Sequence, residues 1–254
     1  MAVASLCGAA GCGGAAARGP ATPVLRIAAA ADLQYAMGEL IEAFRAEHPG
    51  AEVRVSFGSS GTLFAQLENG APFDLYLAAD VAYAERLRDE GLVAPGGVFT
   101  YAVGRIVVWV PDTSTLDVEG LGMEALIQPS VRTVAIANPD HAPYGRAAVA
   151  AMRAFGVYPR VKGRLVLGEN IAQTAQFVQT GAADVGIIAL SLALAPGAGG
   201  RWWEIPAEAH PPILQGGAIM RRARDPGTAR AFVRLLQGPV GRRILARYGF
   251  EEPS

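Results

Sequence analysis

Short apolar runs alternate along this chain with stretches in which apolar residues recur at helical spacing. Residues 24–30 are almost wholly apolar, and apolar positions then recur every three or four residues from Leu33 to Phe44, until Pro49-Gly50 interrupts them. A short apolar run predicts a buried strand, and the longer spacing predicts an amphipathic helix that stops before the proline. The chain is therefore expected to open with a strand, a turn at Ala31-Asp32 and a helix.

The same alternation continues for most of the length. Further strands are predicted at residues 53–57, 74–78, 105–110, 132–137, 164–167, 184–190 and 213–220. Further helices are predicted after residue 58 and at residues 81–90, 146–155, 171–180, 228–236 and 240–247. Alternating strands and helices predict the α/β class, with parallel sheets that carry helices on both faces.

The chain is expected to cross between two lobes at about residues 103–110 and again at about residues 213–219. If both crossings are hinge strands, the first lobe comprises residues 24–104 and 215–254, and the second comprises residues 105–214. A lobe assembled from two separated segments predicts a clamshell.

The loop Gly58-Ser59-Ser60-Gly61-Thr62 ends one predicted strand and opens the next helix. Hydroxyl groups and free backbone N–H groups at a helix N-terminus bind anions, because the first-turn donors lack partners within the helix. The loop contains no Lys or Arg, and the turn at Asp32 has the same design. The alternative is that Asp32 and Ser60 only cap their helices, which is the usual role of Asp and Ser there.

Composition narrows the classes of protein. The chain has 254 residues, of which 51% are hydrophobic, and this supports one large globular domain or two small lobes. A formal net charge of −1 without a long basic run argues against a nucleic-acid partner. No apolar run of about 18 residues follows the N-terminal segment, so no membrane span is expected.

Both cysteines, Cys7 and Cys12, lie in the small and apolar N-terminal segment, so a disulfide framework is not expected. Ala9-Ala10-Gly11-Cys12 resembles a loose lipobox, in which Cys12 would be lipidated. The alternative is an alanine-rich leader without a lipid. In either case residues 1–23 are expected to be a leader and tether outside the fold.

Four segments carry a family resemblance: AAAADLQYAM (Ala28 to Met37), the segment from Ser56 to Asp80, NPDHAPYG (Asn138 to Gly145) and GPVGRRILARYGF (Gly238 to Phe250). Together, and in this order, they resemble the periplasmic molybdate-binding protein family, the solute receptors of molybdate ABC transporters. The resemblance covers nearly the whole chain from Val24 onward.

The resemblance implies a type II periplasmic-binding-protein fold, with two lobes, a two-strand hinge and an oxyanion site in the cleft. The implied ligand is molybdate or tungstate, and the implied partner is the membrane permease of an ABC transporter. A monomer is expected, in the periplasm or lipid-anchored on the outer face of the cytoplasmic membrane. Neither catalysis nor a cofactor is implied.

By position, the family's oxyanion contacts fall on Asp32, Ser60, Tyr144, Ile171 and Ala189, and Ser59 adjoins them in its loop. Tyr144 and Ile171 would donate backbone N–H groups. All of these contacts are to ligand oxygen atoms, and no residue is expected to bind the metal directly.

Two positions depart from the family pattern. Many relatives carry a hydroxyl residue at the position of Asp32 and a tyrosine at that of Ala189; Tyr144 or Tyr35 could supply the missing hydroxyl. A carboxylate about 4 Å from a dianion costs a few kcal/mol at an effective dielectric constant near 20. Asp32 must therefore turn away to cap its helix, bind a proton, or serve a different ligand.

Other functions remain open at this point. A receptor of the same fold for phosphate or arsenate would let Asp32 accept a hydrogen bond from a protonated oxyanion. A hydrolase with Ser59 or Ser60 as nucleophile is more remote, since the loop lacks the G-x-S-x-G pattern. The three histidines, His48, His141 and His210, lie beside or near prolines and are expected to be turn residues.

Overall fold

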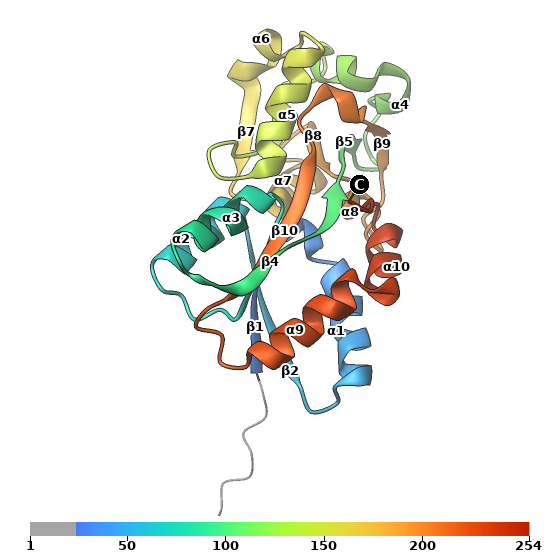
Figure 1. The fold of residues 1–254 in the computed structure, drawn as a ribbon. Coiled ribbons are helices and arrows are strands. Elements are labelled where there is room, and N and C mark those ends of the chain that lie inside the picture. The colour runs from blue at the N-terminus through green and yellow to red at the C-terminus, as the bar shows by residue number, and fades with distance from the viewer. Residues whose placement is uncertain (1–23, 254) are drawn as a thin grey trace, which may run out of the picture.

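The computed structural model describes residues 24–253, which form two five-stranded sheets with their helices (Figure 1). The leader, the tether and Cys12 lie outside the described residues. The first sheet has the order β2-β1-β3-β10-β4. Its strands are β1 (Val24–Ala30), β2 (Glu52–Gly58), β3 (Leu75–Ala78), β4 (Val93–Gly104) and β10 (Ile213–Met220). Its helical segments are η1 (Ala31–Leu33), α1 (Ala36–Glu47), α2 (Ser60–Glu68), α3 (Val81–Asp89), α9 (Pro226–Gln237) and α10 (Pro239–Arg247).

The second sheet has the order β7-β6-β8-β5-β9. Its strands are β5 (Ile106–Val110), β6 (Val134–Ala137), β7 (Leu165–Gly168), β8 (Val185–Ala189) and β9 (Arg201–Glu204). Its helical segments are α4 (Val118–Leu121), η2 (Gly122–Ile127), α5 (Pro143–Ala154), α6 (Tyr158–Val161), η3 (Lys162–Arg164), α7 (Ile171–Gln179), α8 (Leu190–Ala193) and η4 (Ala207–Ala209). The predicted α/β class is confirmed.

Both sheets are mixed, so the expectation of parallel sheets is wrong in part. β1 pairs in parallel with β2 and β3, and β6 pairs in parallel with β7 and β8. β10 runs antiparallel to β3 and β4, and β5 runs antiparallel to β8 and β9. At the crossings between the sheets, β4 leads directly to β5, and β9 leads to β10. These strands are not joined to a neighbour in their own sheet by a helical crossover. They can therefore run opposite to the parallel strands beside them.

Two strands were not expected from the sequence. β4 contains Gly96 and Gly97 and has no regular alternation of buried and exposed positions. β9 contains the pair Trp202-Trp203, which pack half-buried against the second core, where Trp203 meets Phe155 edge to face at 5.7 Å between ring centroids. Pairing with β10 and with β5 makes these segments strands.

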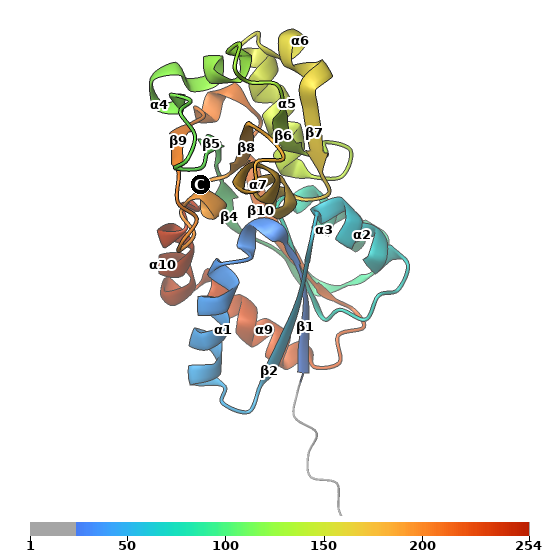
Figure 2. The same ribbon diagram turned by 180° about the vertical axis from the view of Figure 1, so that it is seen from behind.

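The chain passes from the first sheet to the second at Arg105, between β4 and β5, and returns between β9 and β10 (Figures 1 and 2). Residues 24–104 and 213–220 supply the strands of the first sheet, and residues 106–204 supply those of the second. The division into two lobes that move relative to each other stays a prediction. Within residues 24–253, no helix has both the length and the apolar character to cross a membrane.

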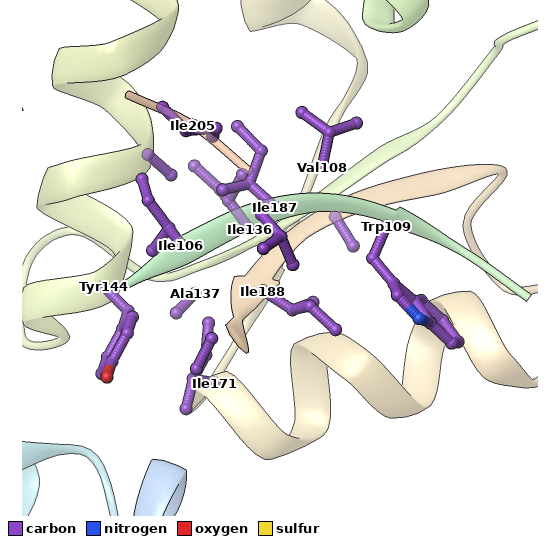
Figure 3. Packing of buried hydrophobic residues seen from close by; sticks show 14 of the residues in the cluster. Ile106, Val108, Trp109, Ile136, Ala137, Tyr144, Ile171, Ile187, Ile188 and Ile205 are labelled. Atoms are coloured by element: carbon purple, nitrogen blue, oxygen red, sulfur yellow. The ribbon is translucent and has the colours of Figure 1, made fainter. Parts of the chain in front are cut away.

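Helices cover both faces of the first sheet (Figure 2). α1, α9 and α10 pack on one face around Phe44 and Phe232, and α2 and α3 pack on the other around Tyr76. The second sheet has one core that includes Ile136 and Ile187 and reaches Tyr144 and Ile171 at its edge (Figure 3). These cores hold the carboxyl ends of the parallel strands in place.

We expect Phe232→Ala to lower the free energy of unfolding by about 3–5 kcal/mol, the usual loss for a buried phenylalanine. Phe232 is fully buried and meets Phe44 edge to face at 5.2 Å between ring centroids, so α9 would lose this contact with α1. Urea denaturation measures the change, and Phe232→Leu, which keeps more of the volume, should lose less. A loss below about 1 kcal/mol would contradict this account of the core.

Candidate functional site

The N-termini of η1, α2, α5 and α7 meet at a small cavity between the two sheets. About 10 Å³ of it is open to the centre of a water molecule. The lining residues that the structure describes include no Lys or Arg; they are Ala30, Ala31, Asp32, Gly58, Ser59, Ser60, Ala79, Ala142, Pro143, Tyr144 and Ile171. The structure therefore brings together five predicted site residues: Asp32, Ser59, Ser60, Tyr144 and Ile171.

A larger cavity, of about 520 Å³ on the same measure, lies between Gln34-Tyr35 and α7. Its polar lining consists mostly of amide side chains, including Gln173, Gln176 and Gln179, and it shares no lining residue with the small cavity. The predicted oxyanion contacts converge on the small cavity, so the site is assigned there on chemistry and not on size.

Helix geometry explains why backbone donors are available at the small cavity. Ser60 and Ile171 are the first residues of α2 and α7, and Tyr144 is the second residue of α5. N–H groups of a first turn have no acceptor within their own helix. The side chain of Asn170 accepts from the N–H groups of Ala172 and Gln173, which leaves the Ile171 N–H outside this cap.

The two serines of the loop have different roles. Ser59 is the N-cap of α2, and its hydroxyl accepts from the Thr62 N–H at 3.2 Å. The Ser60 hydroxyl instead accepts from the Ala79 N–H at 2.9 Å, so the alternative that Ser60 caps the helix is wrong. Among the described residues no acceptor for the Ser60 hydroxyl hydrogen is found, and this hydrogen is available for a ligand at the cavity.

Asp32 does not cap a helix, so that expectation is also wrong. Its carboxylate Oδ2 accepts from the Tyr144 hydroxyl at 2.8 Å and from the Gln215 side-chain amide. The N-cap of η1 is Ala30, and it makes no side-chain bond to the helix. Tyr144 and Gln215 can donate to a carboxylate that only accepts, and they hold it at the junction of the two sheets.

Further hydrogen bonds surround Asp32. Tyr101 donates to Gln215 Oε1 at 2.7 Å, and Ser191 donates to the Asp32 carbonyl at 2.8 Å. Asp32 is 1% exposed, and its Oδ1 has no hydrogen-bond partner within the described part of the chain. Burial raises the pKa of Asp32 above its ordinary value, and the hydrogen bonds from Gln215 and Tyr144 partly oppose this rise.

The remaining expectations at the site differ from what the structure places there. Ala189 ends β8, fully buried opposite Ile106, and it does not line the cavity. Tyr35 lines the larger cavity, and the Tyr144 hydroxyl is bonded to Asp32. Neither tyrosine hydroxyl therefore replaces a donor missing at Ala189. Figure 3 shows Tyr144 and Ile171 close together at one edge of the second core.

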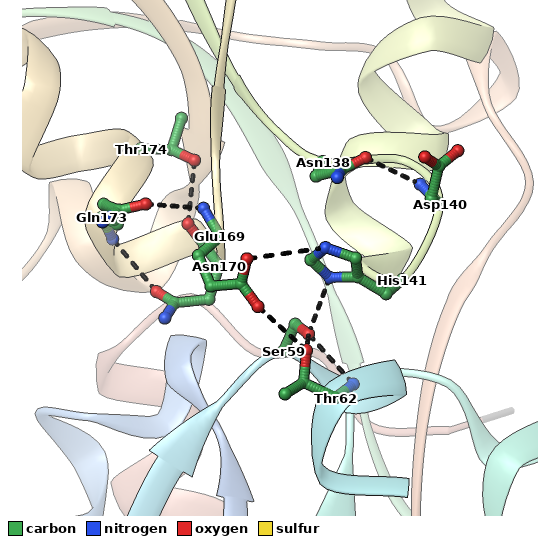
Figure 4. A network of polar contacts seen from close by, with 9 residues as sticks. All are labelled: Ser59, Thr62, Asn138, Asp140, His141, Glu169, Asn170, Gln173 and Thr174. Atoms are coloured by element: carbon green, nitrogen blue, oxygen red, sulfur yellow. Dashed lines mark hydrogen bonds and ion pairs between the residues drawn. The ribbon is translucent and has the colours of Figure 1, made fainter. Parts of the chain in front are cut away.

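His141 has a role that the sequence did not indicate (Figure 4). It lies in the expected turn, but its Nδ1 is 2.9 Å from Ser59 Oγ and its Nε2 is 3.7 Å from Glu169 Oε2. Its carbonyl accepts from the Gly61 N–H at 2.8 Å. A Cβ at Gly61 would stand 2.7 Å from the His141 carbonyl, so the glycine permits this approach. Gly61 was thus the available sequence signal for this close approach, but the sequence does not show that the neighbouring residue is His141, which lies far away in the chain.

The contact between Ser59, His141 and Glu169 has the residue types of a hydrolase triad but lacks its geometry. Ser59 Oγ donates to Thr62 Oγ1 at 2.7 Å, so the hydroxyl hydrogen points away from the imidazole that would act as base. Over residues 24–253, no group of three or more His, Cys, Asp or Glu residues is placed to hold a metal ion. The arrangement offers hydroxyl and backbone donors to a small oxyanion.

Comparison with known proteins gives consistent matches. Residues 25–251 match the family model described as bacterial extracellular solute-binding protein. The molybdate-binding protein ModA of Azotobacter vinelandii is 37% identical over 89% of this chain and 89% of its own length. ModA of Rhodobacter capsulatus is 36% identical over 83% of this chain and 81% of its own. The solved structure of the Azotobacter vinelandii periplasmic molybdate-binding protein superimposes with a TM-score of 0.81, at 30% identity, covering 91% of this chain and 100% of that one.

The raised pKa of Asp32 gives a test of its burial. The folded protein holds this proton to higher pH than the unfolded chain, so above about 3.8 the contribution of Asp32 to the free energy of unfolding falls as pH rises. Asp32→Asn cannot titrate. We expect its free energy of unfolding, relative to wild type, to increase between pH 4 and pH 7 in urea denaturation. A constant or decreasing difference would show that burial does not penalise the charged carboxylate.

Proposed function

Because this chain belongs to the bacterial extracellular solute-binding protein family, and within it to the molybdate-binding proteins, we propose that it is an extracytoplasmic receptor for molybdate. It would deliver the oxyanion to the membrane permease of an ABC transporter. The proposal includes no catalytic step and no cofactor, and the oxyanion is the transported ligand.

The observation that carries this proposal is the neutral donor set of the small cavity. Ser60, Tyr144 and Ile171 lie in the first turns of helices there, and N–H groups at such positions bind oxyanions without a positive side chain. A fully ionised tetrahedral oxyanion has only acceptor oxygens, so a cavity of donors matches it. We propose ligand-binding roles for five residues: Asp32, Ser59, Ser60, Tyr144 and Ile171. Asp32 and Ser59 would contribute backbone N–H groups. Ala189 stays a prediction outside this lining.

The alternative ligands, phosphate and arsenate, need an acceptor for a ligand proton. Asp32 was the candidate acceptor, but its Oδ2 faces Tyr144 and Gln215 and its side chain is buried. These bonds engage Oδ2 only, and Oδ1 has no partner among the described residues. Asp32 therefore keeps one acceptor for a protonated ligand, and the ligand titration below decides between the two classes of oxyanion.

Entry of any oxyanion requires the cavity to open. A volume of about 10 Å³ is close to the minimum for a single water molecule, so an ion of five heavy atoms cannot enter without movement of the lining segments. These segments come from both sheets, and we therefore propose that the two sheets with their helices are the lobes of a clamshell. Tungstate has the same charge and shape as molybdate and belongs to the proposal. A monomeric state, a periplasmic location and a lipid at Cys12 also remain proposals.

Purified protein without residues 1–23 should bind molybdate and tungstate tightly and sulfate far more weakly. The three dianions offer the same acceptors, so the size of the closed cavity must discriminate among them. Isothermal titration calorimetry and thermal shift measure the binding. Heat with phosphate, but none with either metalate, would instead support the alternative receptor.

Ser60→Ala should weaken molybdate binding by roughly ten- to a hundredfold, because a hydrogen bond to a charged acceptor contributes about 1.5–3 kcal/mol. The melting temperature without ligand should also fall, because the buried Ala79 N–H would lose the Ser60 hydroxyl as its acceptor, so affinity is measured at a temperature at which the variant remains folded. Ser130→Ala, at an exposed serine away from the cavity, is the matched control. Unchanged affinity in Ser60→Ala would remove its hydroxyl from the proposed donor set.

A further inference from the structure

An ion pair joins the two halves of the molecule beside the small cavity. Arg146 Nη2 donates to Asp80 Oδ2 at 2.8 Å. Asp80 is the N-cap of α3 in the first half, whereas Arg146 is the fourth residue of α5 in the second (Figure 1). Within residues 24–253, Asp80 is the single ionic partner of Arg146. The pair therefore crosses the boundary at which the proposed clamshell would open.

Arg146 also contacts α3 itself, through Tyr83. Its Nη1 donates to the Tyr83 hydroxyl at 3.2 Å, and its guanidinium carbon lies 5.6 Å from the centre of the Tyr83 ring, within the range of a cation–π contact. The Tyr83 ring in turn packs against Phe64 of α2, at 5.4 Å between ring centroids. An isolated surface ion pair contributes little, but a guanidinium that holds two partners at once is better ordered.

The Asp80 carboxylate uses each oxygen for a different purpose. Oδ1 accepts from the Ala82 N–H at 3.0 Å and so caps α3, and Oδ2 accepts from Arg146. Because the cap already fixes the Asp80 side chain, pairing with Arg146 orders only one further side chain. The acceptor is thus held in place on the first half before the second half reaches it.

The position of the pair connects it to the proposed oxyanion donors. Asp80 follows Ala79, whose N–H donates to the Ser60 hydroxyl at 2.9 Å, and Arg146 lies two residues after Tyr144. Ala79, Ser60 and Tyr144 all line the small cavity. The distance between Asp80 and Arg146 therefore sets how closely the Ser60 segment and the first turn of α5 approach each other.

A gap next to the pair shows that this part of the boundary is not filled by apolar packing. Its volume is about 160 Å³ on the measure used above, and its lining includes Asp80 and Arg146. It shares Ala79 and Pro143 with the small cavity, whereas Arg146 itself does not line that cavity. Arg146 thus contacts the opposite half of the molecule and not the ligand site.

Building on the oxyanion-receptor function proposed above, we propose that Arg146 is a positioning residue whose contacts with Asp80 and Tyr83 hold the closed cleft around the oxyanion. These contacts exist only when the two halves meet, so they stabilise the closed state relative to an open one. A ligand that binds the closed state gains apparent affinity when that state is more populated.

Two single variants with opposite charge changes test this role. Arg146→Met removes the donors, and Asp80→Asn removes the carboxylate charge while its amide oxygen can still cap α3. The dissociation constant for molybdate should rise by roughly three- to tenfold in each, as for a charge-assisted hydrogen bond between partly exposed groups. The rise should come mostly from faster dissociation, because the pair forms once the cleft has closed. Calorimetry measures the affinity, and a chase of labelled by unlabelled molybdate measures the dissociation rate.

Further variants separate a direct pair from a general effect of charge. The double variant Arg146→Met/Asp80→Asn should bind within about twofold of either single variant, because each already removes the same interaction. Arg146→Lys keeps the charge but cannot hold Asp80 and Tyr83 together, so it should restore only part of the affinity. Arg153→Met makes the same charge change at an exposed arginine of α5 that lies over Tyr158, and it should bind as wild type does.

The outcomes distinguish this inference from the function on which it rests. Wild-type affinity and dissociation rate in both single variants would overturn the role of Arg146 and leave the receptor function intact. Weaker binding in Arg146→Met together with tighter binding in Asp80→Asn would overturn it too, because the two charges would then act on the dianion separately. Folded wild-type protein that binds no molybdate would overturn the receptor function, and the role of Arg146 with it.

Discussion

The convergence of four helix N-termini on one cavity between two sheets is the constraint on which the site depends. Parallel strands bring their carboxyl ends to one edge of a sheet, and each following helix starts at that edge. β1 and β2 do this for the first sheet, and β6 and β7 do it for the second. Because the two edges face each other, first-turn N–H groups from both sheets meet without any basic side chain. The site can therefore bind a dianion through dipoles that the fold itself supplies.

Charged side chains lie near this cavity, but they make contacts with other protein groups. The Asp32 carboxylate accepts through Oδ2 from Tyr144 of the second sheet's α5 and from Gln215 of β10, so these bonds also join the two sheets. His141 and Glu169 face each other at the rim. The donors that line the cavity are thus neutral, and the charged groups take part in contacts that join the two sheets beside it.

This arrangement also relates specificity to closure. A neutral donor set cannot distinguish dianions of equal charge by electrostatics, so discrimination must come from how well the closed segments fit the ion. The cavity is small and its lining comes from segments that follow strands of both sheets. A tight approach such as that of Gly61 to His141, where a Cβ would not fit, leaves little freedom in how the sheets meet. The contacts that join the two sheets thus also set the size of the cavity that an ion must fit.

The sequence by itself determined the elements whose signals are local. Apolar periodicity located most strands and helices. The loop at Ser59-Ser60 and the turn at Asp32 do line the cavity, because the hydroxyl and N–H groups that a strand-to-helix turn exposes are set by a few consecutive residues. Tertiary structure alone decided what those residues contact. Asp32 bonds to Tyr144 and Gln215, which are 112 and 183 positions away, and Ser59 meets His141 at a separation of 82. The antiparallel strands β4 and β9 likewise depend on partners distant in sequence. A local pattern records which groups a residue can offer, whereas the hydrogen-bond partner it finds depends on how the whole chain brings the two sheets together.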